Sequence, residues 1–239
     1  LPEKWDKKTI DILKRLSVYN STRAVKTAGI FKKHRKKIQT LISTHFFLNK
    51  HNLHSAKNSE LRVASWNIER GTHLEGIIHT FKNNPELKNA DVLLLTELDI
   101  GMSRSSNKNI PLELAKALNM NVFFANSYLC FSRGTPQEEV ASQANTLGLH
   151  GNAILSKYPL SKAQTIALFN CKDKFCDGEK RLGNQNALIA QTKINNKTFL
   201  FCCNHLDAHS SPKQRKKQTE QILKTLKKQK LMSDRIVIG

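Results

Sequence analysis

The sequence predicts an α+β protein: a two-layer β-sandwich flanked by helices, with a helical extension at the N-terminus. Two observations predict this fold. Residues 1–58 place apolar side chains at helical spacing among many lysines. From Leu61 onward, short apolar runs alternate with turn residues and helix starts. Runs of this kind, combined with a hairpin and covering helices, imply two packed sheets with helices outside.

The N-terminal extension is expected to be helical and basic. Its apolar positions recur at helical spacing within 3–18 and again within 22–50. Residues 1–60 hold 14 Lys and Arg against 4 Asp and Glu. The change of pattern near Leu61 predicts an extension over 1–58 and a domain over 59–239.

The β-sandwich is predicted from apolar runs of strand length and from the residues between them. Asn195-Asn196 separates two of these runs, and because Asn tolerates positive φ, the two strands should be antiparallel neighbours in a hairpin. Asn109 and Ser211, each with a proline just after it, predict the starts of two helices. The expected strands are Leu61–Trp66, Asp91–Leu95, Val122–Ala125, Asn152–Leu155, Gln185–Ile194, Lys197–Cys203 and Arg235–Ile238.

The formal charge of +20 is concentrated at the extension and at 213–230, where 8 basic residues face 1 acidic residue. Such local patches favour contact with a polyanion, or they are solvated lysine-rich helix faces.

No apolar run approaches the roughly 18 residues of a membrane span. The 5 cysteines form no zinc pattern and no complete disulfide set. Cys171 and Cys176 could pair in an oxidising compartment, and free thiols in a cytosolic protein are expected at least as often. The cysteines therefore do not settle the compartment, and a cytoplasmic location is only slightly favoured. The oligomeric state is not predictable.

Polar residues follow four of the apolar runs, where a sheet brings side chains to a common rim. These clusters are Ser65–Glu69, Thr96–Asp99, His150–Ala153 and Asn204–Asp207. Mg²⁺ prefers carboxylate and amide oxygens, so Glu97 and Asn67 make a credible half-site. The alternative partner for the Glu97 carboxylate is Arg104 in a salt bridge.

Four runs resemble successive motifs of the endonuclease/exonuclease/phosphatase superfamily, and they occur in that family's order. The resemblance extends from Leu61 to Gly239. It implies the DNase I-like fold, with four layers in the order α/β/β/α, and a metal-dependent phosphoesterase. The matching runs are LRVASWNIERG (Leu61–Gly71), DVLLLTELDIGMSR (Asp91–Arg104), GLHGNAILSKYPL (Gly148–Leu160) and NHLDAHSSPKQRKKQ (Asn204–Gln218).

The resemblance assigns roles position by position. Glu97 matches the carboxylate that binds Mg²⁺ or Mn²⁺, and Asn67 matches the asparagine that orients the metal and the scissile phosphate. His205 matches a histidine that donates to a phosphate oxygen or aids the leaving group. Asn152 lies in the family's G-N-A-[IL]-L-S strand, where it either contacts substrate or bonds a loop backbone.

Of three further residues, two keep two interpretations each. Asp207 is two positions after His205, so it is expected on the same side of the strand, where it orients His205 or lines the cleft. Arg104 either binds a substrate phosphate or pairs with Asp99. His150 is interpreted as a packed loop histidine.

The family pattern continues after a strand such as Arg235–Gly239 into G-D-x-N and later S-D-H, which supply the general base. Neither motif is in this sequence, so we expect a chain truncated at its C-terminus and inactive by itself. The expected function is metal-assisted in-line hydrolysis of phosphodiesters, with nucleic acid as the favoured substrate. The alternatives are a sphingomyelinase-like or inositol-phosphate phosphoesterase and, from another class, a non-catalytic polyanion-binding protein.

Overall fold

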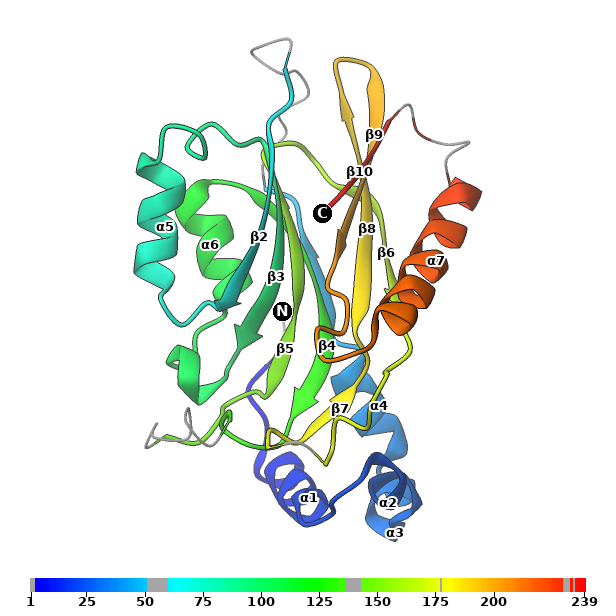
Figure 1. Cartoon of the computed structure of the whole chain (residues 1–239). Helices are drawn as coiled ribbons and strands as arrows, with labels where there is room; N and C mark the ends of the chain where they lie inside the picture. Colours follow the sequence, from blue (N-terminus) through cyan, green and yellow to red (C-terminus); the bar gives the residue numbers. More distant parts are fainter. Residues whose placement is uncertain (1–2, 51–59, 136–142, 177, 230–232, 234) are drawn as a thin grey trace.

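Two β-sheets pack face to face and helices cover both outer faces, as the computed structural model shows (Figure 1). The structure describes residues 3–50, 60–135, 143–176, 178–229, 233 and 235–239. The α+β sandwich expected from the sequence is confirmed, and so is its order of layers.

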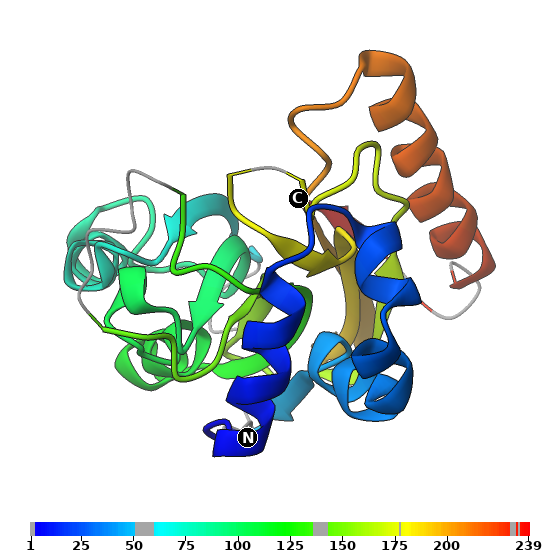
Figure 2. The same ribbon diagram turned by 90° about the horizontal axis from the view of Figure 1, so that it is seen from below.

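The N-terminal segment forms four short helices and then a strand. Seen from below, α1 crosses the lower end of the molecule between the α5/α6 side and α7 (Figure 2). The helical prediction is confirmed for most of this segment, with Leu13 and Leu16 of α1 buried. These elements are α1 (Lys7–Ser17), α2 (Thr22–Thr27), α3 (Gly29–Lys33), α4 (Arg35–Ile42) and β1 (His45–Leu48).

The expectation of helix up to residue 50 is wrong, because β1 pairs antiparallel with β4 (Asn121–Cys130) at the edge of the larger sheet. Phe46 stacks on Phe124 with ring centroids 5.5 Å apart. Cross-strand aromatic packing and backbone pairing outweigh the helical periodicity of so short a run. The boundary between 58 and 59 stays a prediction, and it falls outside the described residues, as do His51 and His54, which have no predicted role.

The larger sheet has the strand order β1-β4-β5-β3-β2, and β7 pairs with the end of β4. The smaller sheet has the order β10-β9-β8-β6. The remaining strands are β2 (Val63–Arg70), β3 (Val92–Ile100), β5 (Leu149–Ser156), β6 (Ser161–Ala167), β7 (Arg181–Gly183), β8 (Asn186–Ile194), β9 (Lys197–Asn204) and β10 (Arg235–Ile238).

Every predicted strand overlaps an observed one, and the predicted hairpin is confirmed. Asn195 and Asn196 have φ of 49° and 64° and join antiparallel β8 and β9. The prediction missed β6, whose side chains are almost all exposed and polar, and β7, which has 3 residues. It also ended β3 early, because the polar residues Thr96, Glu97 and Asp99 interrupt the apolar run while the strand continues to Ile100.

Helices α5 (Leu74–Asn83) and α6 (Ile110–Leu118) cover the larger sheet, and α7 (Pro212–Gln229) covers the smaller one (Figure 1). Both predicted helix starts are confirmed. The Asn109 side chain accepts a hydrogen bond from the Leu112 N–H at 3.2 Å. Ser211 and Gln214 bond each other reciprocally at the start of α7.

Side chains alternate between two cores along β8 and β9. Leu188 and Cys203 face the layer between the sheets. Ile189 and Cys202 face the layer beneath α7. Burial on both faces explains why the sequence shows near-continuous apolar runs. Among the residues that the structure describes, no helix has the length and apolar character of a membrane span.

Candidate active site

Glu97 sits on an irregularity of β3 that turns its side chain out of the regular strand alternation. The pairing of β3 with β5 shifts register between Leu95 and Leu98. Glu97 has φ of 59°, a left-handed conformation that non-glycine residues adopt at an energetic cost. The Asn152 Oδ1 accepts the Glu97 backbone N–H at 3.3 Å. Strain of this kind, held by a buried neighbour, is typical of functional positions.

The Glu97 carboxylate is contacted from both sheets. Asn67 on β2 donates through Nδ2 to Glu97 Oε1 at 3.0 Å. His205, just after β9, places Nε2 3.4 Å from the same oxygen. Arg70 lies on the other side, with one guanidinium nitrogen 3.9 Å from Oε2. The structure therefore brings together Glu97, Asn67 and His205, the three residues that carried the sequence prediction.

The pKa values of Glu97 and His205 are both lowered, which favours the charged form of the carboxyl and the neutral form of the imidazole. Burial opposes ionisation of Glu97, but the field of His150 and the hydrogen bond from Asn67 outweigh it, so the pKa of the Glu97 carboxyl lies below its usual value. Burial lowers the pKa of His205, and the Glu97 charge offsets this only in part. At neutral pH the site thus holds a carboxylate beside a neutral imidazole.

A cleft of about 470 Å³ opens over these residues. Its lining includes Arg70, Glu97 and His205, together with a loop between β6 and β7 that contributes several basic side chains. The cleft therefore combines the carboxylates of Glu97, Glu179 and Asp207 with four Lys and Arg side chains, and this excess of cations suits an anionic ligand.

Comparison with known proteins rests on structure, since neither a protein-family model nor a curated protein matches the chain. The catalytic domain of human Nocturnin, solved with a bound sulfate anion, superposes with a TM-score of 0.50 at 17% identity. The match covers 82% of this chain and 65% of that domain. The chain has the DNase I-like fold.

Other solved structures are similar at lower TM-scores. An endonuclease/exonuclease/phosphatase family protein from Leptotrichia buccalis C-1013-b has a TM-score of 0.46 at 10% identity, covering 70% of this chain and 63% of that one. The beta toxin of Staphylococcus aureus has a TM-score of 0.47 at 16% identity, covering 75% and 65%. The chain thus spans about two thirds of the length of the structures it resembles.

Within this DNase I-like fold, Arg104 does not face the cleft. Its guanidinium is 2% exposed and bonds the Asp99 carboxylate at 2.7 and 3.0 Å. It also donates to both oxygens of Glu179 at 3.1 Å. The pairing with Asp99 is the interpretation that the geometry fits, so we do not keep Arg104 as a substrate-binding residue. The salt bridge from Glu97 to Arg104 is replaced by one from Arg70.

Asn152 and His150 occupy supporting positions. Asn152 is 2% exposed, and besides holding Glu97 it donates to Asn186 Oδ1 at 2.8 Å. This is the backbone-bonding alternative rather than direct substrate contact. His150 places Nδ1 2.8 Å from Asp99 Oδ1 and is buried, as its packed interpretation expected, although it also lines the cleft.

Asp207 lines the cleft, which is the second of its two interpretations. Its Oδ1 lies 3.0 Å from Lys174 Nζ, and both side chains are largely buried. The strand-alternation argument for this residue is wrong, because β9 ends at Asn204 and Asp207 lies in the following loop.

Sequence reasoning missed several residues that line the cleft. Arg70 stood inside a matched motif, and its place after Asn67 was a signal that went unused. Lys172 and Lys174 lie in a loop with no motif, and Lys174 pairs with Asp207, which is 33 residues away. Arg181 begins the short strand β7 and pairs with Glu179. No local pattern identifies such residues.

The donor set of the cleft fits one divalent ion held mostly by water. Among the described residues, no group of three His, Cys, Asp or Glu side chains gathers as a metal cluster. Glu97 instead offers one carboxylate that Asn67 holds by a hydrogen bond, and Mg²⁺ typically binds one or two carboxylates and keeps several waters. Such an ion would replace Arg70 as the countercharge of Glu97.

Proposed function

We propose that the protein is a divalent-metal-dependent phosphoesterase that hydrolyses phosphodiester bonds, with nucleic acid as its substrate. The observation that supports this most is the convergence of Glu97, Asn67 and His205 from separate strands on one cleft. These are the positions that the family resemblance assigned to metal and phosphate. The basic residues around the cleft favour a polyanion over a neutral substrate.

Each side chain has a distinct task in this proposal. Glu97 holds Mg²⁺ or Mn²⁺, an ion that polarises a phosphoryl oxygen and stabilises negative charge in the transition state. Asn67 fixes the carboxylate through its Nδ2 hydrogen bond. His205, neutral at the working pH, donates from Nε2 to a non-bridging or leaving oxygen. Asn152 keeps Glu97 in its left-handed backbone conformation.

The general base belongs, in the family pattern, to the G-D-x-N and S-D-H motifs that follow a strand such as β10. The carbonyl of Gly239, after β10, accepts from Asn204 N and Nδ2, both at 2.8 Å. Asn204 directly precedes His205. These bonds hold Gly239 next to the residue that precedes His205.

The proposed function is tested in a longer form of the protein that carries both motifs. We expect Mg²⁺-dependent cleavage of plasmid DNA or RNA, and none in the presence of EDTA, because charge neutralisation at the phosphate depends on the ion. The chain ending at Gly239 is the matched control, and we expect no turnover from it.

Other outcomes decide between the alternatives. Cleavage of sphingomyelin or an inositol phosphate without cleavage of nucleic acid would replace the proposed substrate. Binding of DNA with no hydrolysis of any of these compounds would favour the non-catalytic polyanion-binding protein. Hydrolysis that persists in EDTA would contradict the proposed mechanism.

A further inference from the structure

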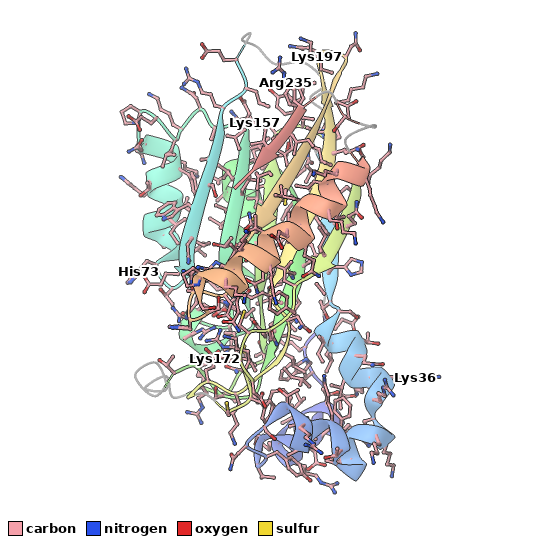
Figure 3. The ribbon with its side chains drawn as sticks, turned by 45° about the vertical axis from the view of Figure 1, so that its right-hand side comes forward. Lys36, His73, Lys157, Lys172, Lys197 and Arg235 are labelled. Atoms are coloured by element: carbon pink, nitrogen blue, oxygen red, sulfur yellow. The ribbon has the colours of Figure 1, made fainter. Side chains whose placement is uncertain are left out.

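The loop between β6 and β7 faces the cleft with one set of side chains. We call residues 171–176 and 178–180 of this loop, together with Arg181 at the start of β7, the cleft loop. Lys172, Lys174 and Arg181 line the cleft. Lys172 is exposed, and Figure 3 shows it at the lower end of the molecule, the end where the N-terminal helices lie. Arg181 packs over the Tyr128 ring and pairs with Glu179 at 2.7 Å. The cleft loop thus brings three cations to one wall of the candidate site, where Lys174 pairs with Asp207 and Arg181 with Glu179. We call this side the cationic wall.

The alternate residues of the same loop attach it to the N-terminal helices. Both oxygens of Asp173 accept the Thr22 N–H at the start of α2, at 3.1 and 2.8 Å, and the Thr22 hydroxyl donates to Oδ1 at 2.5 Å. The Lys180 ammonium donates to the carbonyls of Ser17 and Tyr19, both at 2.7 Å. These carbonyls belong to the C-terminal end of α1 and the turn after it.

The charges of these attachments match the helix ends they meet. A carboxylate is favourable at a helix N-terminus and an ammonium at a C-terminus, because the unpaired N–H and C=O groups there carry opposite partial charges. Between the two attachments, Phe175 is fully buried in the same core cluster as Ile12 and Leu16 of α1. Its ring meets Phe131 edge-on at 4.9 Å.

The N-terminal helices therefore hold a segment that has little regular structure of its own. Before Arg181, the cleft loop forms no strand or helix among its described residues. A segment without such contacts would sample many conformations. Ligand binding would then have to order the segment, at a cost in conformational entropy. Attachment through Asp173, Phe175 and Lys180 removes that requirement.

We propose that the N-terminal helices act as a positioning element for the candidate site, with Asp173 and Lys180 as positioning residues. They hold the cleft loop so that Lys172, Lys174 and Arg181 bind an anionic group of the substrate next to the reacting phosphate. The class of ligand, a phosphate-bearing chain, rests on the proposed function. The attachment itself does not.

The test compares Lys180→Met with wild type, using inorganic phosphate as the probe. We expect Lys180→Met to weaken phosphate binding about fivefold or more, measured by NMR titration, because the loop must then be ordered on binding. Hydrogen exchange of the cleft-loop amides should accelerate, while Mn²⁺ affinity, measured by electron paramagnetic resonance, should stay within about twofold. Lys180→Arg keeps the charge and should restore phosphate binding.

Two further variants make the test decisive. Lys37→Met is the matched control, since it removes an ammonium of the same helices that pairs with Asp6 at 3.2 Å, away from the loop. It should change neither phosphate affinity nor loop exchange. Asp173→Asn removes the other attachment, so it should weaken phosphate binding and accelerate loop exchange as Lys180→Met does. If Lys180→Met folds poorly, Asp173→Asn provides the test.

Specific results would overturn the proposal. The proposal would be contradicted if Lys180→Met and Asp173→Asn both bound phosphate as tightly as wild type. It would also be contradicted if Lys37→Met lost as much phosphate affinity as these two variants. Wild-type protein that binds Mn²⁺ but not phosphate would refute the cationic wall and leave the metal site standing. Wild-type protein that binds no Mn²⁺ would refute the proposed function, while the loop exchange rates would still decide the attachment.

Discussion

Glu97→Gln is expected to abolish divalent-metal binding and metal-dependent turnover while the fold stays intact. Gln has the shape of Glu and keeps a side-chain oxygen for Asn67, but it has no charge to hold the ion. Changes to residues that merely orient a ligand weaken metal binding by 10–100-fold in other proteins, so losing the only carboxylate at the ion should weaken it by about 100-fold or more.

The measurement is Mn²⁺ binding by electron paramagnetic resonance on the chain, with turnover measured in the longer form. Unfolding free energy should change by less than about 1 kcal/mol, because Gln avoids the desolvation of a buried carboxylate. Glu113→Gln on the exposed face of α6 makes the same change of charge far from the cleft and should leave Mn²⁺ affinity unaltered. Retained Mn²⁺ binding in Glu97→Gln would remove Glu97 from the site.

Arg104→Met is expected to cause the largest loss of stability of any single change in the cleft region. The guanidinium is the shared partner of Asp99 and Glu179, and all three side chains are at most 2% exposed. Removing one member of a buried ion network leaves uncompensated charge, which destabilises proteins by about 3–5 kcal/mol. His150 and Arg181 still contact the two carboxylates, so we expect a value near the lower limit, about 3 kcal/mol.

Guanidinium denaturation of the chain measures this loss. The control is Arg62→Met, which breaks an exposed pair with Glu60 at 4.0 Å and should change stability by less than about 0.5 kcal/mol. A change of less than about 1 kcal/mol in Arg104→Met would mean that Arg104 does not hold the network together.

The Arg104→Met variant should also change the pH at which acid unfolding begins. Burial alone would raise the pKa of Asp99, but the charge of Arg104 and the hydrogen bond from His150 bring it below the usual value. A lowered folded-state pKa contributes stability at pH values above the unfolded pKa, and this contribution is lost as pH falls through the folded pKa. Without Arg104 the pKa rises, so acid unfolding should begin at higher pH in Arg104→Met than in wild type.

The sequence predicted those parts of the site that depend on local patterns. It did not predict the parts that depend on contacts between residues far apart in the chain. Asn67, Glu97 and His205 each follow an apolar strand, so local patterns placed them at one rim, and the structure brings them within hydrogen-bonding range or close to it. The bulge at Glu97 was not predictable, because positive φ without glycine leaves no mark in the sequence. The same is true of its support by Asn152, 55 residues away.

Arg104 and Lys180 illustrate where prediction from sequence stops. The sequence kept two roles for Arg104 and included its pairing with Asp99, but its second carboxylate partner, Glu179, is 75 residues away. Lys180 bonds Ser17 across 163 positions, so nothing near either residue indicates the contact. The fold class, in contrast, depends on periodicity within each element, which is why the α+β sandwich was predictable while edge strands β1 and β6 were not.

Paramagnetic broadening by Mn²⁺ tests the central claim most directly, because it locates the ion without requiring turnover. We expect substoichiometric Mn²⁺ to broaden the NMR signals of Glu97, Asn67 and His205 first. Lys157 and Lys197, which Figure 3 shows at the opposite end of the molecule, should keep sharp signals. Equal broadening at both ends, or broadening that spares Glu97, would contradict a divalent-metal site in this cleft.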